Sequence, residues 1–171
     1  GEIYVQEYGP RHAPVLYYLH SGPGYNSHSF RELMHDVLAQ YRVLYVDQRG
    51  GGRSRGVGGE QPEVLRDDIN AVLDALEIET VALLTHGFGT LPGVQFATAH
   101  PERVTHLIMM NPWVSLPQLA ADLYRAALEL ADQPVPEDIP PGDAQLVDMA
   151  FQLVNPKQLL DSMQFPKLQS R

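Results

Sequence analysis

Cysteine is absent from the 171 residues of the sequence, which excludes disulfide bonds and thiolate chemistry. No apolar run approaches the about 18 residues that a membrane-spanning helix needs. The first residues also lack the basic and apolar pattern of a signal peptide. We therefore expect a cytoplasmic protein without a membrane span.

Basic residues are few: 12 Lys and Arg stand against 21 Asp and Glu, and the formal net charge is −9. Such a charge argues against nucleic acid or an anionic membrane as a partner, because both would repel it. The 7 histidines form no H-x-H or H-E-x-x-H pattern. The sequence therefore predicts no metal site, and we expect no cofactor.

Short apolar runs alternate with longer helical patterns along most of the chain. Several of these runs are apolar almost throughout, as in strands that are buried on both faces of a parallel sheet. The alternation predicts an α/β protein with a mostly parallel sheet flanked by helices. Strands are expected at residues 2–8, 15–20, 42–47, 80–86 and 104–111, and helices at 27–41 (capped by Ser27 or Ser29), 62–78, 116–131, 144–154 and 156–165.

The chain changes character after Pro112. No further strand pattern follows, and a proline-rich loop at residues 132–143 separates two of the expected helices. We therefore predict a core domain at residues 1–113 and an incomplete helical region at residues 114–171.

The segment HSGPG (residues 20–24) follows the second expected strand. Two glycines around a proline form a tight loop whose backbone N–H groups can point into a cavity. Such loops supply one half of the oxyanion hole in hydrolases that have a nucleophile elbow. The same pattern also fits a plain turn between a strand and a helix.

The segment DQRGGGRS (residues 47–54) follows the third expected strand. Its glycines suggest a phosphate-binding loop, but their spacing matches neither G-x-G-x-x-G nor G-x-x-x-x-G-K-[ST]. We interpret the segment as a structural turn in which Asp47, Arg49 and Arg53 hydrogen-bond to nearby backbone.

The segment THGFG (residues 85–89) has the pattern of a strand end, a sharp turn and a helix start. A G-x-S-x-G elbow needs small residues two before and two after its tip, because strand and helix pack closely there. The tip residue itself is held in a strained backbone conformation. Gly89 fits this pattern, Thr85 stands in place of a glycine, and Gly87 occupies the tip.

Together, the three motifs resemble those of the α/β-hydrolase fold, and within it those of the proline iminopeptidase group. The motifs of that group read H-G-G-P-G, D-Q-R-G-x-G-x-S and G-x-S-x-G-G. The resemblance covers about residues 1–113, and the helices after Pro112 take the place of the family's cap domain. It implies that the N–H groups of Gly22 and Phe88 form the oxyanion hole and that Gly87 stands at the nucleophile's position.

The resemblance also implies a substrate pocket near His20, Ser21, His86 and Trp113 for a small molecule or a short peptide. His86 equally fits a packed structural histidine, and Trp113 a hinge residue. Carboxylates of the cap region would either bind the free amino terminus of a substrate or serve solubility. These carboxylates belong to Asp122, Glu129, Asp132, Glu137 and Asp138.

Three departures from the family pattern concern the catalytic triad. Glycine has no side chain with which to attack, the family's catalytic Asp and His follow two further strands that the chain lacks, and no histidine here matches the catalytic one. We therefore expect the chain to be part of a longer protein. Because Thr85 and Thr90 also replace glycines of the family, natural loss explains Gly87 better than an engineered substitution.

The expected sheet ends at residues 104–111, which leaves a long apolar edge without its usual neighbours. We therefore expect this segment alone to be poorly soluble, or to need the part of the protein that would cover the edge.

The resemblance thus implies one of two functions. The first is a proline iminopeptidase-related hydrolase of N-terminal proline or of small peptide and ester bonds. It would be inactive or weakly active, because Gly87 replaces the nucleophilic serine. The alternative is a non-catalytic pseudoenzyme that binds a small molecule between core and cap.

Overall fold

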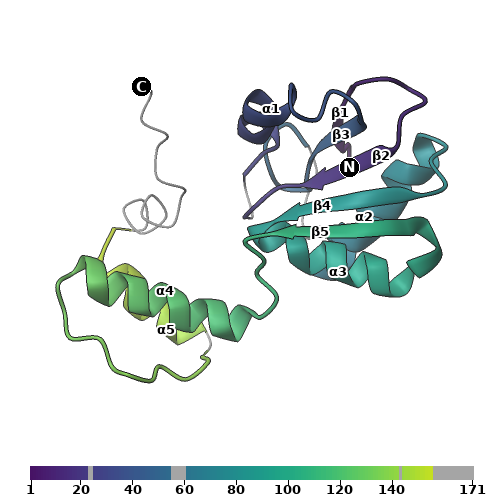
Figure 1. The fold of residues 1–171 in the computed structure, drawn as a ribbon. Coiled ribbons are helices and arrows are strands. Elements are labelled where there is room, and N and C mark those ends of the chain that lie inside the picture. Colours follow the sequence, from purple (N-terminus) through teal and green to yellow (C-terminus); the bar gives the residue numbers. More distant parts are fainter. Residues whose placement is uncertain (23–24, 55–60, 143, 156–171) are drawn as a thin grey trace. The chain divides into compact units, whose positions relative to one another are not determined.

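The computed structural model describes residues 1–22, 25–54, 61–142 and 144–155, and Figure 1 shows the arrangement of their elements. The strands are β1 (Tyr4–Tyr8), β2 (Val15–Leu19), β3 (Arg42–Asp47), β4 (Val81–His86) and β5 (Val104–Met110). The helices are α1 (His28–Met34), α2 (Pro62–Ala75), α3 (Thr90–Ala99), α4 (Leu116–Leu130) and α5 (Ala144–Leu153), with short 3₁₀ turns η1 (Gly87–Gly89) and η2 (Pro101–Arg103).

The strands form one five-stranded sheet in the order β1-β3-β2-β4-β5. β1 is antiparallel to β3, and the other neighbouring strands are parallel, so the prediction of a mostly parallel sheet is confirmed. At the end of β2, Leu19 pairs with Val46 of β3 and with Thr85 of β4. The carboxyl ends of these three parallel strands therefore lie at one edge of the sheet. The three sequence motifs follow these strands, so the topology brings them together.

Helices cover both faces of the sheet. α2 and α3 lie on one face, where Tyr17 and Phe96 belong to the same buried cluster. α1 lies on the other face, where the ring of Tyr18 stacks on that of Phe30 with the centroids 4.0 Å apart. Tyr17 and Tyr18 are both buried although side chains alternate along a strand. The central strands are apolar almost throughout for this reason.

The first helix is shorter than predicted. The pattern at residues 27–41 predicts one helix, whereas α1 has 7 residues and is followed by turns. Leu33 and Val37 are 71% and 64% exposed, so the sheet does not cover these apolar positions. Ser27 does not cap α1 with its side chain, because its hydroxyl donates to Asp47 instead.

The chain divides into two compact units, Gly1–Val114 and Ser115–Arg171. Within the second unit, α4 and α5 pack against each other through a small cluster that includes the buried Ala127 and Ala150. The two helices predicted for this part are confirmed, and the one predicted at residues 156–165 lies outside the described residues.

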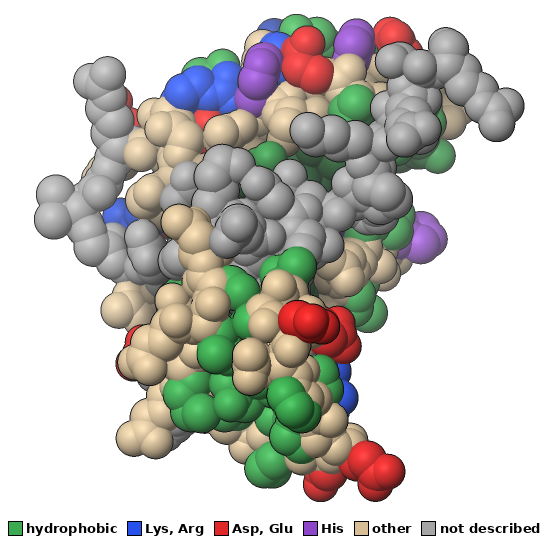
Figure 2. All heavy atoms as spheres, turned by 90° about the vertical axis from the view of Figure 1, so that its left-hand side faces the viewer, with side chains coloured by type: hydrophobic (Ala, Val, Ile, Leu, Met, Phe, Trp, Pro, Cys, Tyr) green, Lys and Arg blue, Asp and Glu red, His purple; other side chains and the backbone are tan. Residues whose placement is uncertain are grey.

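Hydrophobic side chains gather on the face of the second unit that is turned toward the viewer in Figure 2. The exposed apolar residues of this unit include Leu130, Met149 and Phe151. They do not form a membrane span, since none of the helices in the described ranges is long and apolar enough to cross a bilayer.

Candidate active site

The third motif forms a sharp turn after β4. The strand ends at His86, η1 makes the turn, and α3 begins at Thr90. Gly87 has a φ of +51°, in the left-handed region where a residue with a side chain is strained. The tip therefore has the strained conformation that the motif predicts, although it carries no side chain.

Gly89 lies where the start of α3 comes close to the end of β2. A Cβ atom on Gly89 would lie 2.6 Å from the carbonyl oxygen of Leu19 and 2.7 Å from that of His20. Both distances are far below van der Waals contact, and the oxygens belong to backbone that cannot easily move. The packing therefore requires the small residue that the motif predicts at this position.

Thr85 and Thr90, where the family pattern has glycines, are both buried, and their Oγ1 atoms lie 3.1 Å apart. The hydroxyl of Thr85 also donates to the carbonyl oxygen of Ile108 in β5, at 3.4 Å. The methyl group of Thr85 faces Gly93 of α3, where a Cβ atom would lie 2.7 Å from it. A glycine in the facing helix thus makes room for the threonine in the strand, and neither threonine occupies the tip.

Ser21 of the first motif fills the space next to Gly87. A Cβ atom on Gly87 would lie 3.1 Å from the Cβ of Ser21 and would overlap its Oγ. This contact arises because β2 and β4 are neighbours in the sheet, so the loop after β2 reaches the turn after β4. The hydroxyl of Ser21 therefore lies directly beside the place where a side chain at position 87 would begin.

His20 is buried and is held by Gln48 of the second motif. The backbone N–H of Gln48 donates to Nε2 of His20 at 2.8 Å, and its side-chain amide donates to the His20 carbonyl at 2.6 Å. Because Nε2 accepts, the ring proton is on Nδ1, which donates to the carbonyl of Ser21 at 3.1 Å. Burial lowers the pKa of His20 below its ordinary value, which favours this neutral ring. The main chain that carries Ser21 is thereby fixed.

Asp47 at the end of β3 anchors the glycine loop. Its buried carboxylate accepts hydrogen bonds from the backbone N–H groups of Ser27 (2.8 Å) and Arg53 (2.9 Å). Burial alone would raise the pKa of Asp47, but hydrogen bonds from Arg53 and Ser27 outweigh it and lower this pKa to about 2. The prediction that Asp47 hydrogen-bonds to nearby backbone thus agrees with the structure. The same prediction is wrong for the side chains of both arginines, because carboxylates are stronger partners than backbone carbonyls. Arg53 binds Asp47, and Arg49 binds Asp68.

The remaining predicted site residues surround the same turn. Gly22 has a φ of +70°, and Phe88 is buried within η1. The backbone N–H of the half-buried Trp113 donates to the carbonyl of Gly87 at 3.2 Å, so Trp113 lies beside the elbow. His86 is also half-buried, and burial lowers its pKa. The roles of these residues as oxyanion donors and pocket walls stay predictions.

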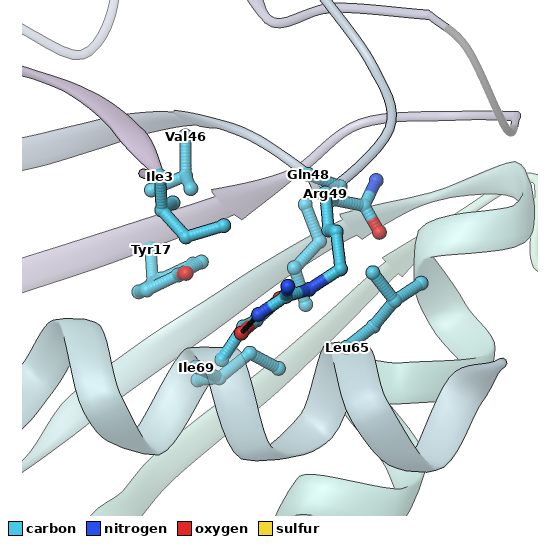
Figure 3. A pocket seen from close by; sticks show the side chains of 9 residues that line it. Ile3, Tyr17, Val46, Gln48, Arg49, Leu65 and Ile69 are labelled. Atoms are coloured by element: carbon cyan, nitrogen blue, oxygen red, sulfur yellow. Dashed lines mark hydrogen bonds and ion pairs between the residues drawn. The ribbon is translucent and has the colours of Figure 1, made fainter. Parts of the chain in front are cut away.

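A small hollow between the sheet and α2 has a different lining. Arg49 reaches across it to Asp68, with Nε 2.8 Å from Oδ2 (Figure 3). None of the predicted site residues lines this hollow, and apart from this ion pair and Gln48 its walls are Ile3, Tyr17, Leu19, Val46, Leu65 and Ile69. Among the residues that the structure describes, no group of three or more His, Cys, Asp or Glu side chains could hold a metal ion.

The order of the strands and the turn after β4 have their counterpart in one known family. Residues 14–167 match the family described as the alpha/beta hydrolase fold. This chain belongs to that family. The fold of this α/β hydrolase is thus one that it shares with relatives of known structure.

Three relatives illustrate the range of the family. The structure of a proline iminopeptidase-related protein from Thermus thermophilus superposes with a TM-score of 0.83 and 34% identity, and it covers 97% of this chain. The enol-lactonase from Burkholderia xenovorans has a TM-score of 0.61 and 25% identity over 76% of this chain. A 2-hydroxy-6-oxononadienedioate/2-hydroxy-6-oxononatrienedioate hydrolase from Cupriavidus pinatubonensis is 36% identical over 123 residues, or 69% of this chain.

This α/β hydrolase chain spans only part of each relative. It covers 57% of the Thermus structure, 54% of the lactonase and 43% of the Cupriavidus hydrolase. What the whole protein acts on is therefore a matter for proposal.

Two contacts of the site have no counterpart among the sequence predictions. The first is that of Ser21 with the tip, and its signal was the serine in HSGPG where the family pattern H-G-G-P-G has a glycine. The second is the bond of Gln48 to His20, because the motif that contains Gln48 does not say which carbonyl its amide binds.

Proposed function

We propose that this chain forms the core of a proline iminopeptidase-related hydrolase. Its substrates are short peptides with N-terminal proline or small esters, which it hydrolyses slowly or not at all. The observation that carries the proposal is the tip of the elbow, where Gly87 keeps the left-handed conformation of an elbow nucleophile but has no side chain.

The surroundings of the tip support this function. Phe88 lies at the start of a helical turn, where N–H groups lack a partner within the helix, and Gly22 lies in the loop after the neighbouring strand. Their N–H groups would hold the oxyanion of the reacting carbonyl. Serine hydrolases without their nucleophile keep a residual acceleration of about 10³–10⁴ over water, so slow turnover is the expected result. The likeness to the Thermus protein supports the peptidase class.

The alternative function is binding without catalysis, and the position of Ser21 favours it. A hydroxyl next to the tip can hydrogen-bond the carbonyl or carboxylate of a small molecule or a short peptide instead of letting it react. The net charge of −9 makes nucleic acid and anionic membranes poor ligands for either function.

Restoring the nucleophile tests the hydrolase. Gly87→Ser alone forces its Cβ against Ser21, so the double variant Ser21→Gly, Gly87→Ser is the informative one. In the intact protein, we expect hydrolysis of proline p-nitroanilide or p-nitrophenyl acetate to rise from the parent through Gly87→Ser to the double variant. The gain of the double variant over the parent should be about 100-fold or more, because the nucleophile supplies most of the chemical acceleration in such enzymes.

The matched control combines Gly87→Ser with Ser29→Ala, because Ser29 is an exposed serine of α1. This variant should behave like Gly87→Ser alone. The hydrolase function is overturned if the double variant is folded, as judged by circular dichroism, and is as inert as the parent on both substrates. The binding function then remains.

A further inference from the structure

The hydroxyl of Ser21 lies where an elbow nucleophile acts. In an elbow, the reacting oxygen is one bond beyond the Cβ of the tip residue, and here the Oγ of Ser21 lies so close that it would clash with a Cβ on Gly87. Ser21 is half-buried, so its side chain is not sealed within the core. The site therefore still has a serine hydroxyl at the tip, although Gly87 does not supply it.

The position of Ser21 follows from its anchored main chain. Its carbonyl accepts a hydrogen bond from Nδ1 of His20 at 3.1 Å, and Gln48 holds the ring of His20 through Nε2 at 2.8 Å. The buried ring and β2 together determine where the loop begins. A reactive group must be held in this way by its surroundings to be useful.

We propose that Ser21 is the nucleophile of this site, in place of the serine that is missing at position 87. This inference rests on the proposed function, since it names the reactive group of the same site. The substrates that fit are acyl donors, namely esters or amides of small carboxylic acids.

The reaction is an acyl transfer in two steps. The Oγ of Ser21 forms a bond to the carbonyl carbon, the bond from that carbon to the leaving alcohol or amine breaks, and the hydroxyl proton ends on the leaving group. Water then cleaves the acyl-serine, releases the acid and returns a proton to Oγ. An unassisted serine hydroxyl is a weak nucleophile, so this reaction is slow.

A fluorophosphate probe reports the reactive serine directly. When the intact protein reacts with diisopropyl fluorophosphate, a bond forms between Oγ and phosphorus, fluoride leaves, and the hydroxyl proton passes to water. We expect one adduct in the intact mass, and tandem mass spectrometry should place it on Ser21. The adduct should be lost in Ser21→Ala and kept in Ser29→Ala, which removes an exposed hydroxyl of α1.

Three results overturn the proposal: no adduct on the parent, an adduct on another residue, or an adduct that persists unchanged in Ser21→Ala. The mapping is made on the unaltered protein, so it decides the matter even where a variant does not fold.

The variant Ser21→Gly, Gly87→Ser separates this proposal from the proposed function. If that variant hydrolyses substrate and the parent forms no adduct on Ser21, the proposed hydrolase function is supported and the proposal that Ser21 is the nucleophile is overturned. An adduct on Ser21 together with an inert double variant has the opposite meaning. Ser21 is then a reactive serine, and the proposed proline iminopeptidase-related function is overturned.

Discussion

At the scale of single residues, the side chains of positions 21 and 87 would crowd each other at the tip of the elbow. The family pattern has a glycine in the loop after β2 and a serine at the tip, whereas this chain has Ser21 and Gly87 at those places. Because a Cβ atom on Gly87 would lie 3.1 Å from that of Ser21, the two side chains crowd each other, and the loop would have to shift by a few tenths of an ångström to hold both. A side chain at position 87 is therefore accommodated better when residue 21 is a glycine, as in the family pattern.

The bond between Gln48 and His20 leads to a prediction at the same scale. Gln48→Leu keeps the volume of the side chain but removes the amide that donates to the buried His20 carbonyl. An acceptor left without a partner costs about 1–3 kcal/mol, so the free energy of unfolding should fall by that amount. Urea unfolding of the intact protein measures it.

The matched control is Gln118→Leu, because Gln118 is exposed on α4. Its effect should stay within about 0.5 kcal/mol. Equal effects of the two substitutions would show that the amide of Gln48 does not hold the loop.

A further prediction at this scale concerns pH. Burial lowers the pKa of His20 below its ordinary 6.5, so the unfolded chain binds a proton at pH values where the folded protein does not. Stability is therefore full above about pH 6.5 and falls as the pH decreases below it, by up to about 1.4 kcal/mol per pH unit for one such group. His86, whose pKa burial also lowers, contributes with the same sign.

Urea unfolding at a series of pH values on both sides of this point measures the slope. NMR of the ring nitrogens identifies the state of His20, which should remain neutral with its proton on Nδ1. A charged His20 ring in the folded protein near pH 6.5 would contradict the prediction.

The sequence could predict those features of these residues that a local motif determines, but not those that depend on contacts between distant segments. The need for a small residue at Gly89 was predictable, because the elbow motif itself states it. The contact of Ser21 with the tip was not, since it depends on β2 lying next to β4. Strand order is decided by the packing of the whole sheet, and a motif does not contain it.

At the scale of elements, the contact between β4 and α3 explains how the elbow tolerates a threonine. The methyl group of Thr85 lies in the space that Gly93 leaves open. The hydroxyl groups of Thr85 and Thr90 meet between the strand and the helix. A larger residue in the strand is thus matched by a smaller one in the helix.

This match predicts a coupled pair of substitutions. Gly93→Ala places a Cβ 2.7 Å from the Thr85 methyl group and 3.2 Å from a terminal methyl of Leu19, so it should lower the free energy of unfolding by about 1–3 kcal/mol. Adding Thr85→Ser removes the methyl group, keeps the hydroxyl and should recover part of that loss. Urea unfolding of the two single variants and the double variant gives the coupling. Strictly additive effects would show that Thr85 and Gly93 do not share this space.

The helices show why a hydrophobic pattern predicts position better than length. Residues 27–41 have an apolar period, yet α1 ends after 7 residues, and Val37 is 64% exposed. A pattern identifies the side that a helix can bury, but the neighbouring elements decide how much of that side is covered. The crossover helix α2 satisfies its pattern, because Leu65, Ile69 and Leu73 are buried against the sheet.

At the scale of the whole molecule, the sheet of the described residues ends at β5. This strand pairs with β4 on one side, and Ile108 and Met109 are 45% and 47% exposed. An apolar edge strand with unpaired backbone groups is a surface on which another strand can pair. The sequence predicted this edge, because the apolar run at residues 104–111 was the last strand pattern that it contains.

The exposed edge of β5 predicts that the 171-residue chain self-associates. Met109→Lys should reduce this association, because a charged side chain on an edge strand disfavours pairing with a second copy. Leu33→Lys is the matched control: Leu33 is 71% exposed on α1, and both substitutions replace an apolar residue and add one positive charge. Sedimentation velocity over a range of concentrations should show less association for Met109→Lys and little change for Leu33→Lys. Equal effects of the two would mean that net charge governs the association, and an unchanged Met109→Lys would mean that the molecules meet elsewhere than at this edge.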